Sequence, residues 1–279
     1  MSIIMRSLFF ILFLSCAFPT FAQQPPQKEP AAIQDNSFLI EEAYNQEAGI
    51  VQHINTFMRL RGGDWVYTFT QELPVKSIKH QFSYTLVAQK AGSAPDGGRG
   101  LGDMLLNYRY QLIGDGNAKV AVSPRFSVLL PTGSVRKGLG AGAPGVQLNL
   151  PVSVVLSRHF VTHWNAGATY TRAAKNALGE KADTTGYNLG QSVVWLARPR
   201  FNALLETAWN SSETVTGNKQ KTRDNTLFIN PGVRWAHNFH SGLQIVPGVS
   251  VPLGVGTNRG ERAIFFYLSF EHPFKKRSE

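Results

Sequence analysis

The chain of 279 residues contains a single cysteine, Cys16. Because this cysteine lies within the first 22 residues, the rest of the chain has no thiol for a disulfide or a thiolate metal site. Acidic residues are also few, with 18 Asp and Glu against 28 Lys and Arg. Beyond residue 22, no stretch approaches the roughly 20 apolar residues that a membrane-spanning helix requires. The sequence thus excludes cysteine redox chemistry and a bundle of transmembrane helices.

Residues 1–22 have the pattern of a secretory signal peptide. Arg6 precedes an apolar run over residues 8–18, which is too short to span a bilayer, and the small residues within 20–22 mark a cleavage site. We therefore expect export and a mature chain that begins after residue 22. The alternative, lipid acylation at Cys16, is weaker because the apolar run continues past it.

The formal net charge of +10 has different meanings inside and outside the cell. An exported chain meets anionic lipid and lipopolysaccharide before it meets nucleic acid, so we expect no nucleic-acid partner. Residues 23–37 are rich in Gln and Pro and show no periodicity, which predicts a disordered lead-in on the periplasmic side. The expected location is the outer membrane of a Gram-negative bacterium.

From about residue 50 onward, segments of roughly ten residues alternate between apolar and polar side chains. Residues 104–112 are the clearest example, since Leu106 and Tyr108 fall on one face and Asn107 on the other. We find about twelve such segments, the number expected of a medium-sized membrane barrel. Alternation alone also fits a soluble β-sandwich, whose apolar face would meet a core instead of lipid.

The connections distinguish these two folds, because membrane barrels alternate tight periplasmic turns with longer external loops. Tight links fall at residues 74–77, 114–117, 157–159, 197–199 and 237–240, and longer stretches at 89–101, 131–144, 172–185, 211–224 and 254–262. The hairpin at residues 61–64 would be an unusually short external loop. The sequence therefore predicts an all-β fold, a closed antiparallel transmembrane β-barrel of about 12 strands over residues 38–274, with both termini periplasmic and a tail at residues 275–279.

Four phrases of the chain carry a family resemblance. They are residues 38–47 (FLIEEAYNQE), 51–54 (VQHI), 65–72 (WVYTFTQE) and 107–112 (NYRYQL). With these phrases the chain resembles the outer-membrane transporters named for the meta-pathway of phenol degradation, and the resemblance covers most of the mature chain. It implies a barrel more firmly than a substrate, and it brings no catalytic or binding residues.

Candidate chemistry is sparse. The glycine-rich residues 97–102 and 133–138 do not lead into a helix, as a phosphate-binding loop requires. His159 and His163 are four residues apart, and on a strand this separates them by roughly 13 Å, too far for one metal ion. Ser157 shares a face with His159, but no hydrolase motif surrounds them. We expect no metal, no cofactor and no enzyme activity, and an outer-membrane lipid hydrolase is the least favoured alternative.

Charged residues on the predicted polar interior face or at its rims form the candidate site. A charge that faces lipid near the membrane centre costs about 2–4 kcal/mol, so interior placement is favoured. These residues either pair with one another or line a path for small aromatic or anionic solutes, and Arg109 with Arg125 would form a positively charged constriction. The candidates are Arg59, Glu72, Asp103, Arg109, Lys119, Arg125, Glu206, Arg234 and Glu271.

A second, basic set falls in the expected external loops, where lipopolysaccharide phosphates are the natural partners. Its members are Lys90, Arg99, Arg136, Lys137, Lys175, Lys181, Lys219, Lys221, Arg223 and Arg259. The sequence supports two main hypotheses, a small-molecule transporter or channel and a structural or surface-interaction barrel with a plugged lumen. In the second case, side chains or residues 38–46 would fill the modest bore of twelve strands.

Overall fold

The structure is a computed structural model that describes residue 33 and residues 36–90, 98–115 and 117–273. The expected signal peptide and C-terminal tail lie outside the described residues, as does most of the expected lead-in. They stay predictions from the sequence. Within the described residues, no helix is long and apolar enough to cross a bilayer.

Sixteen strands form one antiparallel sheet. They are β1 (Ile50–Leu60), β2 (Trp65–Val75), β3 (Ser77–Lys90), β4 (Arg99–Leu101), β5 (Met104–Tyr110), β6 (Val120–Val122), β7 (Arg125–Leu130), β8 (Gly145–Ser157), β9 (Phe160–Lys175), β10 (Lys181–Arg198), β11 (Phe201–Gly217), β12 (Gln220–Trp235), β13 (His237–Asn238), β14 (Gln244–Ser250), β15 (Leu253–Val255) and β16 (Ala263–Pro273), with one 3₁₀ turn, η1 (Gly256–Asn258).

The sheet closes on itself as a barrel of twelve strands. Four barrel strands are each interrupted and therefore carry two labels. β4 and β5 both pair with β3, and β6 and β7 both pair with β8. Likewise, β12 and β13 both pair with β14, and β14 and β15 both pair with β12. Pairing of β14 with both β12 and β16, and of β16 with β1, completes the ring. The predicted closed antiparallel barrel is confirmed.

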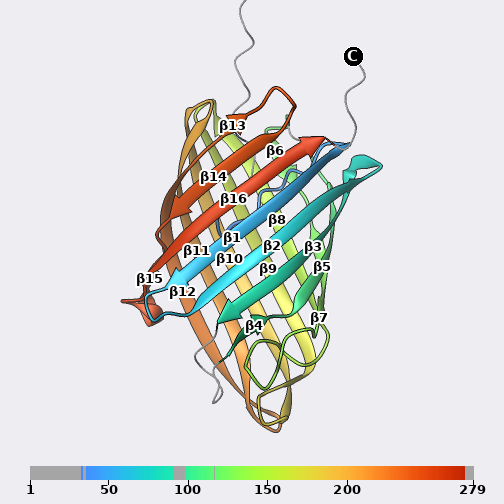
Figure 1. Ribbon diagram of the computed structural model, residues 1–279, viewed down its shortest axis with the longest axis vertical. Helices are drawn as coiled ribbons and strands as arrows, with labels where there is room; N and C mark the ends of the chain where they lie inside the picture. The colour runs from blue at the N-terminus through green and yellow to red at the C-terminus, as the bar shows by residue number, and fades with distance from the viewer. Residues whose placement is uncertain (1–32, 34–35, 91–97, 116, 274–279) are drawn as a thin grey trace, which may run out of the picture. The chain divides into compact units, whose positions relative to one another are not determined.

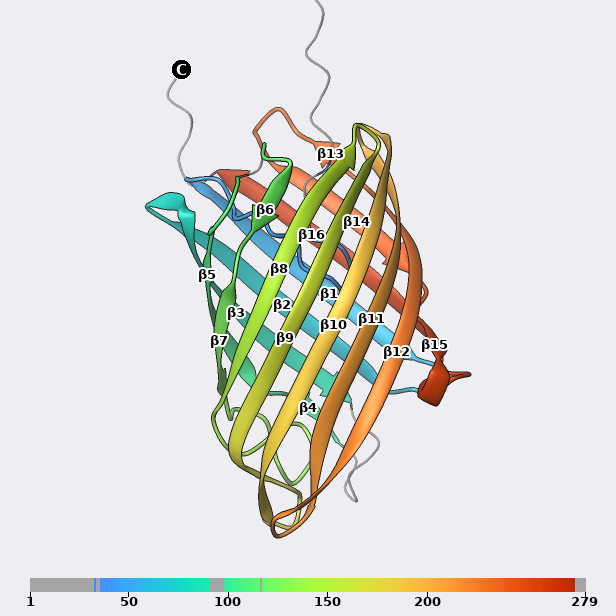
Figure 2. The same cartoon turned by 180° about the vertical axis from the view of Figure 1, so that it is seen from behind.

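The two ends of the barrel differ. β1 begins at Ile50, paired with Pro273 at the end of β16, so both termini of the barrel lie at one end, which we call the terminal end. It is the upper end in Figures 1 and 2, and it carries tight turns, such as the one at Lys76 that connects β2 to β3. The opposite end, the loop end, carries the connection at residues 131–144 and two long hairpins, β9–β10 and β11–β12.

These two hairpins correct a sequence expectation. Residues 172–185 and 211–224 were predicted as loops, but the strands continue, and β11 turns into β12 through Asn218 and Lys219 alone. Their cross-strand partners explain why: Glu213 pairs with Arg223 in the ladder, and threonines line both strands. β-Branched residues and opposite charges across a pair stabilise strands in water as well as in lipid.

The wall of the barrel is apolar outside and polar inside. Large side chains are exposed around its outer surface, including Leu148, Leu189, Trp195, Leu205 and Phe266. Buried polar side chains fill the inner face of the same strands, including Asn107, Asn149, Ser192, Asn202 and Ser269. This is the reverse of a soluble protein, and it suits a wall whose outer side meets hydrocarbon.

Candidate functional site

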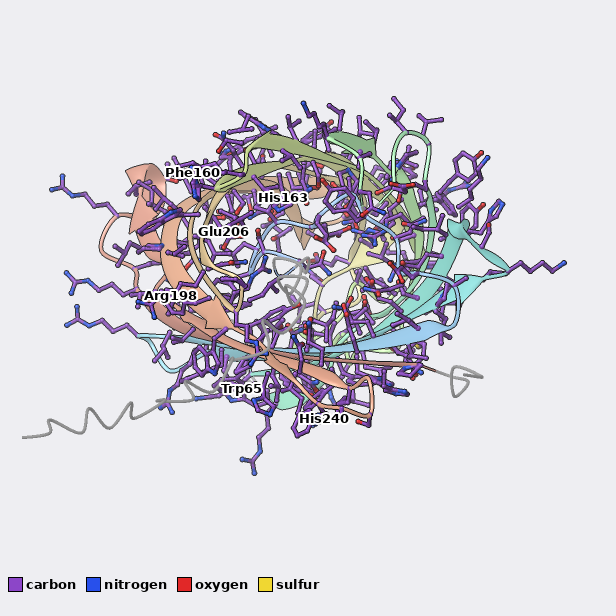
Figure 3. The ribbon with its side chains drawn as sticks, turned by 90° about the horizontal axis from the view of Figure 1, so that it is seen from above. Trp65, Phe160, His163, Arg198, Glu206 and His240 are labelled. Atoms are coloured by element: carbon purple, nitrogen blue, oxygen red, sulfur yellow. The ribbon has the colours of Figure 1, made fainter. Side chains whose placement is uncertain are left out.

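A stretch of non-strand chain occupies the inside of the barrel. Residues 36–46, which we call the inner segment, form no strand, and most of their side chains are buried. Figure 3 looks along the barrel, with Glu206 and His163 on the inner side of the wall and Phe160 on the outer side. Because buried backbone groups need hydrogen-bond partners, the wall must supply them through its side chains.

Glu206 of β11 holds the first part of the inner segment, residues 36–40. Its carboxylate accepts the backbone N–H of Leu39 at 3.0 Å and of Ile40 at 3.2 Å. Asn230 of β12, the cross-strand neighbour of Glu206, donates to the same carboxylate at 2.6 Å. A carboxylate accepts only, so three donors around it stabilise its charged form in a fully buried position.

Glycines of the wall make room for two apolar side chains of this part. A methyl group on Gly232 or Gly248 would overlap the ring of Phe38, and one on Gly190 would overlap Ile40. Phe38 also packs against two rings of β16, Phe265 and Tyr267, with each pair of centroids 5.7 Å apart. Because these three wall positions carry no side chain, they leave space for Phe38 and Ile40 of the inner segment.

Arg109 of β5 holds the second part of the inner segment, residues 42–46. Its guanidinium donates to Asn45 Oδ1 at 2.8 Å, to the Tyr44 carbonyl at 2.9 Å and to the Glu42 carbonyl at 3.2 Å. A carboxylate oxygen of Glu72 lies 3.7 Å from Nη2. The planar guanidinium, with five N–H donors, thus gathers three acceptors of one chain segment and a balancing charge.

In the part of the chain that the structure describes, the inner segment pairs with no neighbouring strand, and side-chain amides of the wall form hydrogen bonds with its backbone instead. Gln111 accepts from the backbone N–H of Asn45 and donates to the Ala43 carbonyl, both at 2.8 Å. Asn165 of β9 accepts from the backbone N–H of Glu41 and donates to its carbonyl, both at 2.9 Å. Each amide thereby satisfies one donor and one acceptor of otherwise unpaired backbone.

Between these two parts, Glu41 forms a bidentate pair with Arg125 of β7. Arg125 Nη2 lies 2.7 Å from Oε1, and Nε lies 3.0 Å from Oε2. The same guanidinium donates to Asn107 and Ser127 through Nη1 and to Gln147 through Nη2. Two parallel N–H···O bonds are the strongest arrangement that Arg makes with a carboxylate.

His159, His163 and Ser157, which the sequence offered as candidate chemistry, have structural roles, and His163 has Ser153 of β8 as its partner. Ser153 Oγ lies 2.7 Å from His163 Nδ1 and accepts the backbone N–H of Ala43 at 2.8 Å. Ser157 instead accepts the backbone N–H of His159 within a tight turn. Among the described residues, no group of three or more His, Cys, Asp or Glu side chains is arranged to bind a metal.

Cavities remain inside the barrel beside the inner segment, and two of them are lined by both Glu41 and Arg125. The first, about 280 Å³, is lined on one side by threonines of β1, β2 and β3 and by apolar Ile54, Leu105, Phe265 and Tyr267. The second, about 310 Å³, is lined by amides of β8, β9, β10 and β11. Arg125 and Glu41 line both cavities together with Leu39 and Ile40, so the ion pair lies at the boundary between the two spaces.

At the loop end, residues 131–144 fold against the inner wall. The Asp103 carboxylate accepts the backbone N–H of Gly133 at 2.9 Å and of Ala141 at 2.7 Å, and Gln89 donates to the Leu139 carbonyl at 3.0 Å. Leu139 is buried. Asp103 therefore fixes a loop at this end of the barrel.

The structure brings most of the sequence candidates inside the barrel but not all. Glu72, Arg109, Glu206 and Arg234 are buried, and Gln46 Nε2 lies 3.4 Å from a carboxylate oxygen of Glu271. Lys119 is exposed beside the turn that precedes β6. The expected inward placement of Arg59 is wrong, because this residue is exposed and pairs with outward-facing Ile264.

The expected constriction also has a different composition. Arg109 and Arg125 are direct cross-strand partners, which would place two like charges side by side. Each is balanced by a carboxylate, Glu72 or Glu41, and each binds the inner segment. The sequence had pointed to such carboxylate pairing as the alternative to an unpaired positive path. It gave no signal for Gln111 or Asn165 as backbone partners, beyond their place on a polar face.

Comparisons with known proteins bear on the fold. No protein-family model and no curated protein sequence matches this chain. Among solved structures, it is similar to an outer-membrane channel of Pseudomonas putida F1, with 13% identity, a TM-score of 0.62, and 82% of this chain and 97% of that chain covered. The KdgM porin, in complex with oligogalacturonate, has 9% identity and a TM-score of 0.46 over 80% of this chain and 99% of its own. The similarity to the Pseudomonas channel supports the fold of an outer-membrane barrel, and the family resemblance stays a prediction.

Proposed function

We propose that this chain is an outer-membrane channel for small molecules whose lumen is closed by the inner segment. The observation that carries the proposal is a barrel with an apolar outside and a polar inside, whose bore holds the inner segment, bound by non-covalent contacts, and several cavities. In the proposed orientation the terminal end faces the periplasm and the loop end faces the exterior, as in other bacterial barrels.

The inner segment is the reason to prefer a channel over a solid structural barrel. Wall side chains alone do not fill the bore, and glycines at positions 190, 232 and 248 keep it open where the segment docks. A barrel that served only as a scaffold would be filled by large side chains of its own wall. The surface-interaction barrel is the second candidate, and it requires the inner segment to stay in place permanently.

The solutes that we propose are small, with aromatic or anionic character. The first cavity combines rings with the threonine hydroxyl pairs Thr56–Thr68 and Thr70–Thr85, whose oxygens lie 2.6 and 2.9 Å apart. Such walls suit a compact apolar body that carries a polar group.

Conductance in planar bilayers tests the proposed channel. The double variant Phe38→Ser/Ile40→Ser removes the apolar contacts of the inner segment and leaves the wall unchanged, and Ala48→Ser, in an exposed position, is the control. We expect the wild type and the control to conduct equally, and the double variant to conduct more or to stay open longer. Absence of conductance in all three folded proteins would contradict a channel.

We also propose that lipopolysaccharide phosphates bind the basic side chains of the long hairpins. Lys181 and Lys219 are exposed at their tips, whereas Lys221 and Arg223 both pair with Glu213 at 2.8 Å. Lys181→Glu/Lys219→Glu should therefore retain less lipopolysaccharide during purification than the wild type does. Equal retention would contradict this contact.

A further inference from the structure

In the ion pair between Arg125 and Glu41, the wall holds the side chain of Arg125 more firmly than that of Glu41. Arg125 is 13% exposed and is fixed by three acceptors of the wall, Asn107, Ser127 and Gln147, from β5, β7 and β8. The Glu41 side chain is 32% exposed, and within the described chain its carboxylate has hydrogen bonds with Arg125 alone. The arginine is thus preorganised, and the carboxylate is the member that can leave.

Departure of this carboxylate does not require the inner segment to move. The backbone N–H and carbonyl of Glu41 are both bound to Asn165, which holds the main chain at this residue. Rotation of the Glu41 side chain toward either cavity is sufficient to expose the Nε and Nη2 edge of Arg125. That edge is a fork of two donors, which matches the two oxygens of a carboxylate.

The surroundings of the fork suit an organic acid. The first cavity, about 280 Å³, begins at Arg125 and is bounded by Leu105, Phe265 and Tyr267, which would contact an apolar body. An arriving anion replaces one carboxylate at Arg125 by another, so Arg125 keeps a counter-charge. A cation would bind Glu41 and leave the largely buried Arg125 without its partner, which is costly. The lumen therefore favours an anion at this point.

We propose that Arg125 is a binding site for the carboxylate of small organic acids with an apolar body, and that Glu41 occupies this site when no solute is present. The inference rests on the proposed channel and names the class of solute that its lumen recognises. No covalent step is involved, since the solute exchanges ion pairs with Glu41.

Calorimetric titration of the purified full chain in detergent tests the site, with benzoate as the probe and benzamide as its uncharged counterpart. Glu41→Ala removes the competing carboxylate, and we expect it to bind benzoate at least about tenfold more tightly than the wild type, as charge-assisted hydrogen bonds imply. Glu41→Ala/Arg125→Gln should lose this gain. Benzamide should bind all variants alike.

Two outcomes would overturn the proposal: Glu41→Ala binds benzoate no better than the wild type, or the double variant keeps the gain. Circular dichroism confirms that each variant is folded. If Glu41→Ala/Arg125→Gln does not fold, Glu41→Ala/Arg125→Lys replaces it, because lysine keeps the charge but loses the fork, and the gain should then shrink.

The test is separate from that of the channel. Conductance without tighter benzoate binding in Glu41→Ala would overturn the Arg125 site and leave the channel standing. Tighter benzoate binding without conductance in any variant would overturn the channel and leave the site.

Discussion

The two parts of the inner segment are held by different physics. Phe38 and Ile40 are held by shape, in hollows where the wall has glycine, with one carboxylate binding the backbone between them. Residues 42–46 are held mainly by hydrogen bonds from Arg109 and Gln111, and their apolar contact is a small cluster of Ala43 and Tyr44 with Ala121. Shape fits one side chain at one place, whereas hydrogen bonds to the backbone fit any sequence that follows the same path. We therefore expect the two parts to respond to different substitutions.

Two reporters distinguish the parts. Ser37 and Ala43 are buried in the first and second part, and no cysteine follows Cys16, so Ser37→Cys or Ala43→Cys gives one thiol beyond residue 22. Each thiol should react with a soluble reagent only when its part leaves the wall. Ala48→Cys, in an exposed position, sets the rate of free labelling.

Arg109→Ala should have the largest effect. It removes three hydrogen bonds to the second part and the cation beside Glu72. Breaking a buried charged network costs about 3–5 kcal/mol, and we expect the free energy of unfolding in urea to fall by about this amount. The Ala43→Cys reporter should react faster while Ser37→Cys stays protected. Unchanged stability and labelling would mean that Arg109 does not hold the inner segment.

The barrel itself was predictable from the sequence, for a physical reason. A wall between lipid and a polar lumen forces each strand to alternate, so strands such as β5 and β8 could be assigned to faces directly. β1 has little contrast between its faces, since His53 and Asn55 lie outside while Ile54 and Met58 lie inside. The error at Arg59 follows from that weak contrast.

The candidate site was less predictable. The polar faces indicated which residues point inward, but the partners of the inner segment come from β3, β5, β8, β9 and β11, far apart in the chain. Alternation carries no information on which inward side chain meets which backbone group. The long hairpins were missed because threonine and charged residues also occur in loops, and only the cross-strand pairing distinguishes the two.

Gly248→Ala should have the next largest effect, and it should act on the other part. Its side chain would overlap the Phe38 ring, and overpacking of this kind costs about 1–3 kcal/mol. The Ser37→Cys reporter should become reactive while Ala43→Cys stays protected. The control is Gly186→Ala, whose added carbon meets only ordinary contacts. Equal exposure of both reporters would show that the inner segment leaves as one unit.

Glu206→Gln should have the smallest effect of the three. The amide keeps the shape and one acceptor for the backbone N–H of Leu39 or Ile40, but it loses the charge that strengthens these bonds. We expect a loss of about 1 kcal/mol, seen as slightly faster labelling of Ser37→Cys. Glu261→Gln, in an exposed position, is the control. A loss as large as that of Arg109→Ala would contradict the view that shape dominates this part.

The most direct test of a channel closed by its inner segment is a disulfide that locks the segment to the wall. Ser37 Oγ and Ser192 Oγ of β10 lie 2.8 Å apart, so Ser37→Cys/Ser192→Cys places two thiols in contact. We predict that single-channel conductance in planar bilayers is absent when this variant is oxidised and returns after reduction. Equal conductance in the oxidised and reduced states would contradict the account.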